Sequence, residues 1–241
     1  MRRSWISITA LILLSAPVSS QSADNIIRLS RIAGFPDQVV GGEILTAACA
    51  KLGIKVELED VPAERALVLS NSGQVDGEIQ RIAGVEKTYT SLVPIPVAIN
   101  YIEPSVFTVS QTFTVDGWES IRPYSIGIVH GVGSSERGTK GMPRVEAVGD
   151  QATLLNMLDH GHIDIAVTDV FSGQIAVKKL HLENRVHALQ PPLQRIYLYH
   201  YLNDRHRDLA KQVEEVLRAM EADGELARLR ETFVKQALEI N

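Results

Sequence analysis

Cysteine is almost absent from this sequence: Cys49 is the single one among 241 residues. An intrachain disulfide is therefore excluded. Cys49 lies in the segment TAACAKLG, whose small and apolar residues indicate a buried position on a helix face. We interpret Cys49 as a small core residue rather than a reactive thiol.

Runs of basic residues are also missing, and the formal net charge is −5. Because nucleic-acid phosphates require clustered Lys and Arg, no nucleic-acid partner is expected. The sequence has no G-x-S-x-G elbow and no Walker loop, and its GVGSS turn is not a dinucleotide fingerprint. His160 and His162 have no third ligand at a recognisable spacing. We therefore expect neither a metal site nor a cofactor.

The sequence has no hydrophobic run long enough to cross a membrane, because the apolar run from Trp5 to Leu14 is too short. Arg2 and Arg3 precede this run, and small residues with Pro17 follow it, which is the layout of a secretory signal peptide. We assign residues 1–23 to that peptide, with cleavage after Ser20 or Ala23 left open. No cysteine lies near the cleavage region, which excludes a lipid anchor there. The exported protein is expected to be soluble and periplasmic.

Strand-like runs alternate with segments of helical periodicity over the remaining residues. We predict strands at 26–31, 55–61, 75–79, 125–129 and 163–167, and helices that stop at Gly53 and Gly73. This alternation predicts an α/β fold with mainly parallel strands.

A short internal similarity predicts two lobes. In both copies an apolar helix stops at a glycine, Gly73 or Gly161, and a strand with a β-branched residue and an aspartate follows. Chance is the alternative, since such junctions are common in α/β proteins. Strand-like segments at 93–115 and 194–202 are long enough to cross between lobes. We assign residues 24–110 and 195–241 to the first lobe and 111–194 to an inserted second lobe.

Four segments in order resemble the family 3 extracellular solute-binding proteins, which include the amino-acid receptors of ABC importers. They are LGIKVELEDVP with SGQVDGEI, then IGIVHGVGSSE, LLNMLDHGHIDIAVTD and VEEVLRAMEADGELARLRETF. The resemblance covers the whole mature chain. It implies a type II periplasmic-binding fold, in which two α/β lobes joined by two crossing strands close on a ligand by a hinge.

Candidate ligand-binding residues follow the predicted second-lobe strands, because open α/β sheets bind ligands at the carboxyl ends of their strands. Gly131, Ser134 and Ser135 lie in a turn before a helix, where N–H groups and hydroxyls suit a carboxylate. A plain helix N-cap is the alternative. Asp169 follows the strand at 163–167. The resemblance implies that an aspartate here receives the ammonium group of the ligand.

In the first lobe, Arg65 and Arg81 are placed to point guanidinium groups into the cleft, and Glu78 is placed to pair with one of them. A solvated role is the alternative for each arginine. Phe35 is the candidate aromatic platform. The family's carboxylate-binding arginine follows a Thr-rich loop, which here reads IAGVEKTY, so either Lys87 or Arg81 takes its role. Amino-acid specificity is therefore open.

We expect a monomeric binding protein that captures a small polar ligand, amino-acid-like or carboxylate-bearing, and serves the membrane permease of an ABC-type importer or a sensor. It is expected to perform no chemistry. The alternative is an exported enzyme on the same scaffold, similar to cyclohexadienyl dehydratases, with Glu78 or His130 as general acid or base. A third interpretation is that the chain is an accessory protein that uses its lobes to dock a partner.

Overall fold

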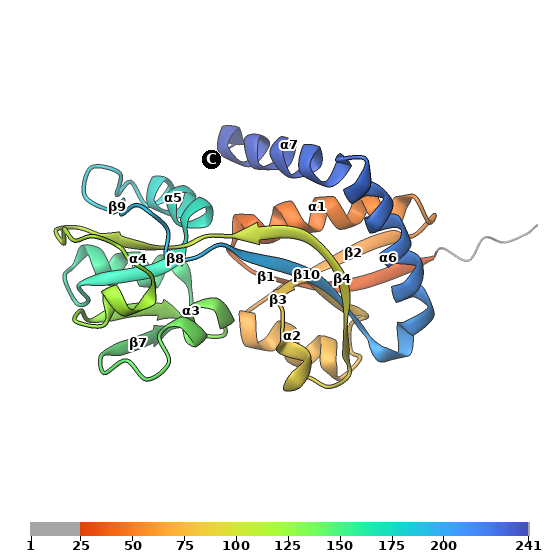
Figure 1. Cartoon of the computed structure of the whole chain (residues 1–241), viewed down its shortest axis with the longest axis horizontal. Helices are drawn as coiled ribbons and strands as arrows, with labels where there is room; N and C mark the ends of the chain where they lie inside the picture. Colours follow the sequence, from red (N-terminus) through yellow and green to blue (C-terminus); the bar gives the residue numbers. More distant parts are fainter. Residues whose placement is uncertain (1–24, 241) are drawn as a thin grey trace, which may run out of the picture.

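The computed structural model describes residues 25–240, which form two α/β lobes side by side (Figure 1). The signal peptide expected at 1–23 lies outside the described residues. Among residues 25–240 no helix is both long enough and apolar enough to cross a membrane. The α/β class and the two-lobed architecture predicted from the sequence are confirmed.

The first lobe is built on a mixed sheet with the order β2-β1-β3-β10-β4. In that order the strands are Lys55–Val61, Ile26–Ile32, Gly77–Ile82, Ile196–Asn203 and Leu92–Ile102. Strands β1, β2 and β3 are parallel, and β10 runs antiparallel to β3 and β4. The helices of this lobe are α1 (Pro36–Ala50), α2 (Ala63–Asn71), α6 (Arg207–Ala222) and α7 (Glu225–Ile240), with the short helices η1 (Val85–Lys87) and η3 (Asp204–His206).

The second lobe has the strand order β7-β6-β8-β5-β9. In that order the strands are Val145–Val148, Ile126–Val129, Ile165–Asp169, Pro104–Thr108 and His187–Ala188. Its helices are α3 (Gly133–Gly138), α4 (Gln151–Asp159) and α5 (Val170–Lys179), with the short helix η2 (Trp118–Ile121). Strands β6, β7 and β8 are parallel, whereas β5 is antiparallel to β8.

Two extended segments connect the sheets (Figure 1). One runs from β4 through Glu103 into β5, and the other returns along β10. Because β5 pairs with β8, residues 104–108 lie in the second sheet, and the first crossing is at Glu103 rather than near residue 110. A hinge of two strands lets the lobes rotate without unfolding either sheet.

Each lobe has its own apolar core. In the first, α1 and α6 pack on the sheet around Leu29, Ile44 and Leu217, none of which is exposed. Cys49 belongs to this core, which confirms the prediction that it is buried, and burial raises the pKa of its thiol to about 11. In the second lobe Phe107 is buried among residues of α4 and β8.

The C-terminal helices return to the first lobe, as the sequence pattern predicts. Buried residues recur along α6 with helical spacing, at Ala210, Val213, Leu217 and Met220. The chain turns at Gly224, with a φ of 76° that suits glycine, and α7 then lies over α1 (Figure 1).

Gly77→Ala should destabilise the first lobe, because an added Cβ would lie 2.3 Å from the carbonyl oxygen of Tyr201 on β10. We expect the free energy of unfolding to fall by about 1–3 kcal/mol in urea denaturation. Gly149→Ala is the control, since its Cβ would meet no atom within 4 Å. Equal stability of the two variants would contradict the observed approach of β10 to β3.

Candidate functional site

A cavity of about 50 Å³ lies between the two lobes. Its polar lining residues are Asp37, Gln38, Gln80 and Arg81 from the first lobe, and Ser134 and Asp169 from the second. Its apolar lining residues are Ile32, Phe35, Ile82, Ile102, Val132 and Leu198, with Gly133. Ligand pockets commonly have about 300–1,000 Å³. This cavity is smaller, and hydrogen bonds between the lobes, from Arg81 to Gly131 and between His130 and Glu64, show that the lobes are in contact around it.

The cavity lies where the carboxyl ends of parallel strands from both sheets meet, as expected for open α/β sheets. Strand β1 leads to Phe35, and α1 begins at Pro36, whose fixed φ suits the first position of a helix. Strand β3 ends beside the cavity with Gln80 and Arg81. From the second lobe, Asp169 is the last residue of β8.

Two buried carboxylates, Asp37 and Asp169, come from opposite lobes, with 5% and 9% of their surface exposed. Ser172, in the first turn of α5, links them: its Oγ donates to Asp37 Oδ1 at 2.8 Å and its N–H donates to Asp169 Oδ2 at 3.0 Å. Burial, and next the charge of Asp169, raise the pKa of Asp37 to about 7. Burial also raises the pKa of Asp169, against hydrogen bonds from Ser172 and Glu103.

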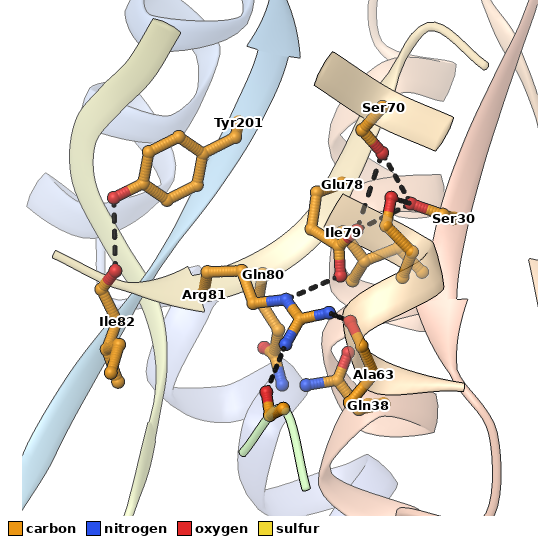
Figure 2. Close-up of polar contacts among 12 residues, drawn as sticks. Ser30, Gln38, Ala63, Ser70, Glu78, Ile79, Gln80, Arg81, Ile82 and Tyr201 are labelled. Carbon is orange, nitrogen blue, oxygen red and sulfur yellow. Dashed lines mark hydrogen bonds and ion pairs between the residues drawn. The ribbon is translucent and has the colours of Figure 1, made fainter. Parts of the chain in front are cut away.

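The Arg81 guanidinium contacts three parts of the molecule. Its Nε donates to Glu78 Oε1 at 2.8 Å, and its terminal nitrogens donate to the carbonyls of Ala63 at 2.5 Å and Gly131 at 3.3 Å. Figure 2 shows the guanidinium among these groups, with the amides of Gln38 and Gln80 nearby. Since Gly131 belongs to the second lobe, Arg81 is also an interlobe contact.

Glu78 is fully buried behind Arg81. Its Oε2 accepts from Ser30 Oγ at 2.5 Å and from Ser70 Oγ at 3.4 Å (Figure 2). Burial raises the pKa of Glu78, and the charge of Arg81 opposes that rise. With its oxygens engaged and no place on the cavity lining, Glu78 supports Arg81 rather than contacting a ligand.

Further contacts at the rim join the lobes. His130 Nε2 lies 2.7 Å from Glu64 Oε2 on α2, and Arg137 donates to the Ala83 carbonyl at 2.8 Å. Gly131 packs directly against α2, where an added Cβ would lie 2.7 Å from the backbone nitrogen of Glu64. With a φ of +78°, Gly131 is a position where only glycine permits both the turn and this close approach.

The residues singled out from the sequence divide into two groups. Phe35, Arg81, Ser134 and Asp169 line the cavity together. The other four lie elsewhere: Glu78 is buried behind Arg81, Gly131 is at the rim, Ser135 is buried beneath the turn, and Arg65 is exposed on α2. Lys87, the possible substitute for the family's arginine, is exposed on η1.

Sequence reasoning missed Asp37, Gln38 and Gln80. The signal for Asp37 was its place directly after Phe35 and Pro36, at the start of a helix that follows a strand. Gln80 escaped notice because β3 was expected to end at residue 79, whereas it continues to Ile82 with every residue buried. A polar residue inside such a strand is itself a signal, because burying it requires partners.

His160 and His162 stack with their ring centroids 6.2 Å apart between the end of α4 and the start of β8, whereas the cavity residue Asp169 is the last residue of β8. Within residues 25–240, no group of three or more His, Cys, Asp or Glu side chains is placed to hold a metal ion.

Comparison with known proteins bears on the family and the fold of this chain. A model of the bacterial extracellular solute-binding proteins, family 3, matches residues 35–236. The chain belongs to this family. The resemblance inferred from the sequence motifs is thereby confirmed. Membership of an extracellular family implies an exported protein, and its members are mostly binding proteins rather than enzymes.

Known relatives of this family 3 protein are distant in sequence and close in fold. An uncharacterised protein of Shewanella oneidensis is 26% identical over 195 residues, which are 78% of this chain and 73% of the relative. The sensor domain of a histidine kinase superimposes with a TM-score of 0.73 at 16% identity, over 87% of this chain and 96% of the domain.

Two arginine-bound structures share the fold as well. An ancestral arginine-binding protein superimposes with a TM-score of 0.72 at 17% identity, over 87% of this chain and 98% of that chain. An amino acid ABC transporter substrate-binding protein of Streptococcus pneumoniae gives 0.72 at 13% identity, over 88% of this chain and 96% of that chain. At these identities the likeness establishes the two-lobed fold.

Glu78→Gln should destabilise the family 3 protein strongly, because it leaves the Arg81 guanidinium buried without its countercharge. We expect a loss of about 3–5 kcal/mol in the free energy of unfolding. Glu57→Gln removes one member of the exposed pair with Lys55 and should cost about 0–1 kcal/mol. Similar losses in urea denaturation would show that the Arg81–Glu78 pair does not stabilise the lobe.

Proposed function

We propose that this protein is a periplasmic receptor that captures a small ligand bearing a positively charged group in the interlobe cavity. The observation that carries the proposal is the buried Asp169 carboxylate on the cavity lining, opposed across the lobes by Asp37. A buried carboxylate is stable when a cation or hydrogen-bond donors satisfy it. The N–H groups of Glu103 and Ser172 already donate to Asp169, so a protonated amine would add the positive charge.

The rest of the ligand should be compact and partly apolar. Six apolar side chains from both lobes and the hinge strands line the cavity, and Phe35 supplies an aromatic surface from the first lobe. Ser134 provides a hydroxyl on the second-lobe side. This lining supports a ligand with an aliphatic body and one polar end beyond the amine.

Arg81 is less suited to hold a ligand carboxylate than the arginine of an amino-acid receptor. It already donates to Glu78, Ala63 and Gly131, so part of its hydrogen-bonding capacity is used within the protein. We therefore favour a cationic or zwitterionic ligand recognised mainly through its positive end.

Closure of the lobes would then signal occupancy to a membrane partner. The contacts of Arg81 with Gly131 and of His130 with Glu64 exist only when the lobes meet, so the closed surface differs from the open one. We propose that a permease of an ABC-type importer, or a sensor, recognises the closed monomer. An arginine-binding protein and a histidine kinase sensor domain share the fold.

The enzymatic alternative has no specific support. Its two candidate proton carriers are Glu78, which is buried away from the cavity lining, and His130, which lies on the rim between two carboxylates. Neither is placed to transfer a proton to a ligand inside the cavity.

Asp169→Asn should weaken binding of the cationic ligand by about 2–5 kcal/mol without unfolding the protein, because asparagine keeps the cap of α5 and loses the charge. Ligands are first identified by a thermal-shift screen against amino acids, polyamines, small carboxylates and sugars. Calorimetry then compares the affinities of wild type and variant.

Asp150→Asn is the matched control, because Asp150 caps α4 of the same lobe and accepts from the Thr153 N–H outside the cavity. It should leave affinity unchanged. Equal affinity of Asp169→Asn and wild type would remove Asp169 from the binding site. A screen in which no compound raises the melting temperature would count against the receptor itself.

A further inference from the structure

Asp37 is a second carboxylate on the cavity and belongs to the lobe opposite Asp169. It lies in the first turn of α1, and Ser172 of the second lobe is its interlobe partner in two hydrogen bonds. Its other oxygen accepts from Gln80 Nε2 at 3.1 Å and from Gln38 Nε2 at 3.3 Å. Closing the lobes therefore brings two carboxylates into one buried site.

An unused acceptor borders the same site. Gln38 is 4% exposed and lines the cavity, and its Oε1 is buried without a hydrogen-bond partner among the described residues. The Oε1 of Gln80 is also buried without a hydrogen-bond partner among the described residues. A buried acceptor that lacks a donor costs free energy, which a ligand with N–H groups removes. The cavity thus has acceptors in excess.

Buried charge around the cavity is also unbalanced. Arg81 and Glu78 neutralise each other, which leaves Asp37 and Asp169. Arg230 on α7 opposes the rise of the Asp169 pKa, and its partners Asn100 and the Tyr101 ring are uncharged, so it offsets part of the negative charge of the pair. Two carboxylates that are removed from water together oppose their own burial unless positive charge or a proton joins them.

We infer that Asp37 and Asp169 form a charge gate, in which repulsion between one carboxylate from each lobe opposes closure of the empty cleft until a protonated amine, or a proton, neutralises the pair. Asp37 is thereby the residue that restricts productive closure to cationic ligands. This inference rests on the proposed receptor function and adds the ligand charge and the trigger for closure.

The sign of the pH dependence follows from Asp37. In the closed form its pKa is raised to about 7, whereas in the open form its carboxylate is in water and has an ordinary aspartate pKa. Between these two pKa values the empty closed form therefore holds a proton that the open form has released. Closure of the ligand-free protein is therefore most favourable at acidic pH and becomes less favourable as the pH rises from the ordinary aspartate range to about 7. A bound amine replaces the proton, so its affinity should rise over the same interval.

Other titratable and charged side chains near Asp37 and Asp169 are already hydrogen-bonded or ion-paired within the protein. His200 on β10 hydrogen-bonds the carbonyls of β3, and burial lowers its pKa to about 4, so it stays neutral over this interval. Arg31 on β1 pairs with Asp60 on β2. Strand β4 contributes the uncharged Asn100, whose amide donates to the Asp37 carbonyl.

The first test measures closure of the ligand-free protein by small-angle scattering at about pH 5.5 and about pH 8.5, below and above the raised pKa of Asp37. Wild type should be more compact at the lower pH. Asp37→Asn keeps an acceptor for Ser172 but loses the charge, so it should be compact at both pH values. Asp169→Asn removes the carboxylate charge of the second lobe, so this variant should also be compact at both pH values. Asp60→Asn, a first-lobe carboxylate outside the cavity, should follow wild type.

Calorimetry with isobutylamine, putrescine and L-arginine, against the neutral isobutanol and the anionic succinate, is the second test. Amines should bind wild type at least about tenfold more tightly than Asp37→Asn. Binding at about pH 5.5, where the empty protein is closed with Asp37 protonated, should release up to about one proton from wild type and none from the variant, as shown by two buffers of different ionisation enthalpy. Asp60→Asn should match wild type.

Failure of the gate and failure of the receptor are distinguishable. Wild-type closure by succinate or isobutanol, or equal pH dependence of wild type and Asp37→Asn, overturns the gate and leaves a receptor for another ligand. Absence of closure and of thermal stabilisation with every compound overturns the receptor, and the gate with it.

Discussion

The cleft depends on the buried guanidinium of Arg81. It joins the end of β3, the start of α2 and the turn after β6, so it orders the first-lobe wall and contacts the second lobe at once. A buried arginine is tolerated only with a countercharge, which Glu78 supplies under the hydroxyls of Ser30 and Ser70. The polar side chains of the cavity are arranged around this pair.

Because Glu78 neutralises Arg81, the remaining charge of the cleft is negative. That residual charge lies on Asp37 and Asp169, which the two lobes contribute separately, so the electrostatic cost arises only on closing. Two hinge strands permit the motion, and contacts such as His130 with Glu64 stabilise its end point. Closure thus balances favourable rim contacts against the burial of like charges.

Local pattern was sufficient for the α/β class and, through motif order, for the family. It also selected Phe35, Arg81, Ser134 and Asp169, which line the interlobe cavity, because each stands at the end of a strand or in the turn after one. It was wrong where a strand boundary shifted: β3 ends at Ile82, which placed Gln80 within the buried sheet beside the cavity. Residues 104–108 likewise lie in the second sheet, since strand pairing is not encoded in a local run.

The sequence by itself determined which segments form helices and strands and that the protein has two lobes, since periodicity and glycine stops are local properties. Only the tertiary structure decided the roles of the charged residues. The sequence placed Glu78 to pair with Arg65 or Arg81, and the structure shows that Arg81 is its partner. Asp37 meets Asp169 across 132 positions of chain only when the lobes close. Such partners depend on packing between elements distant in sequence, which no local pattern contains.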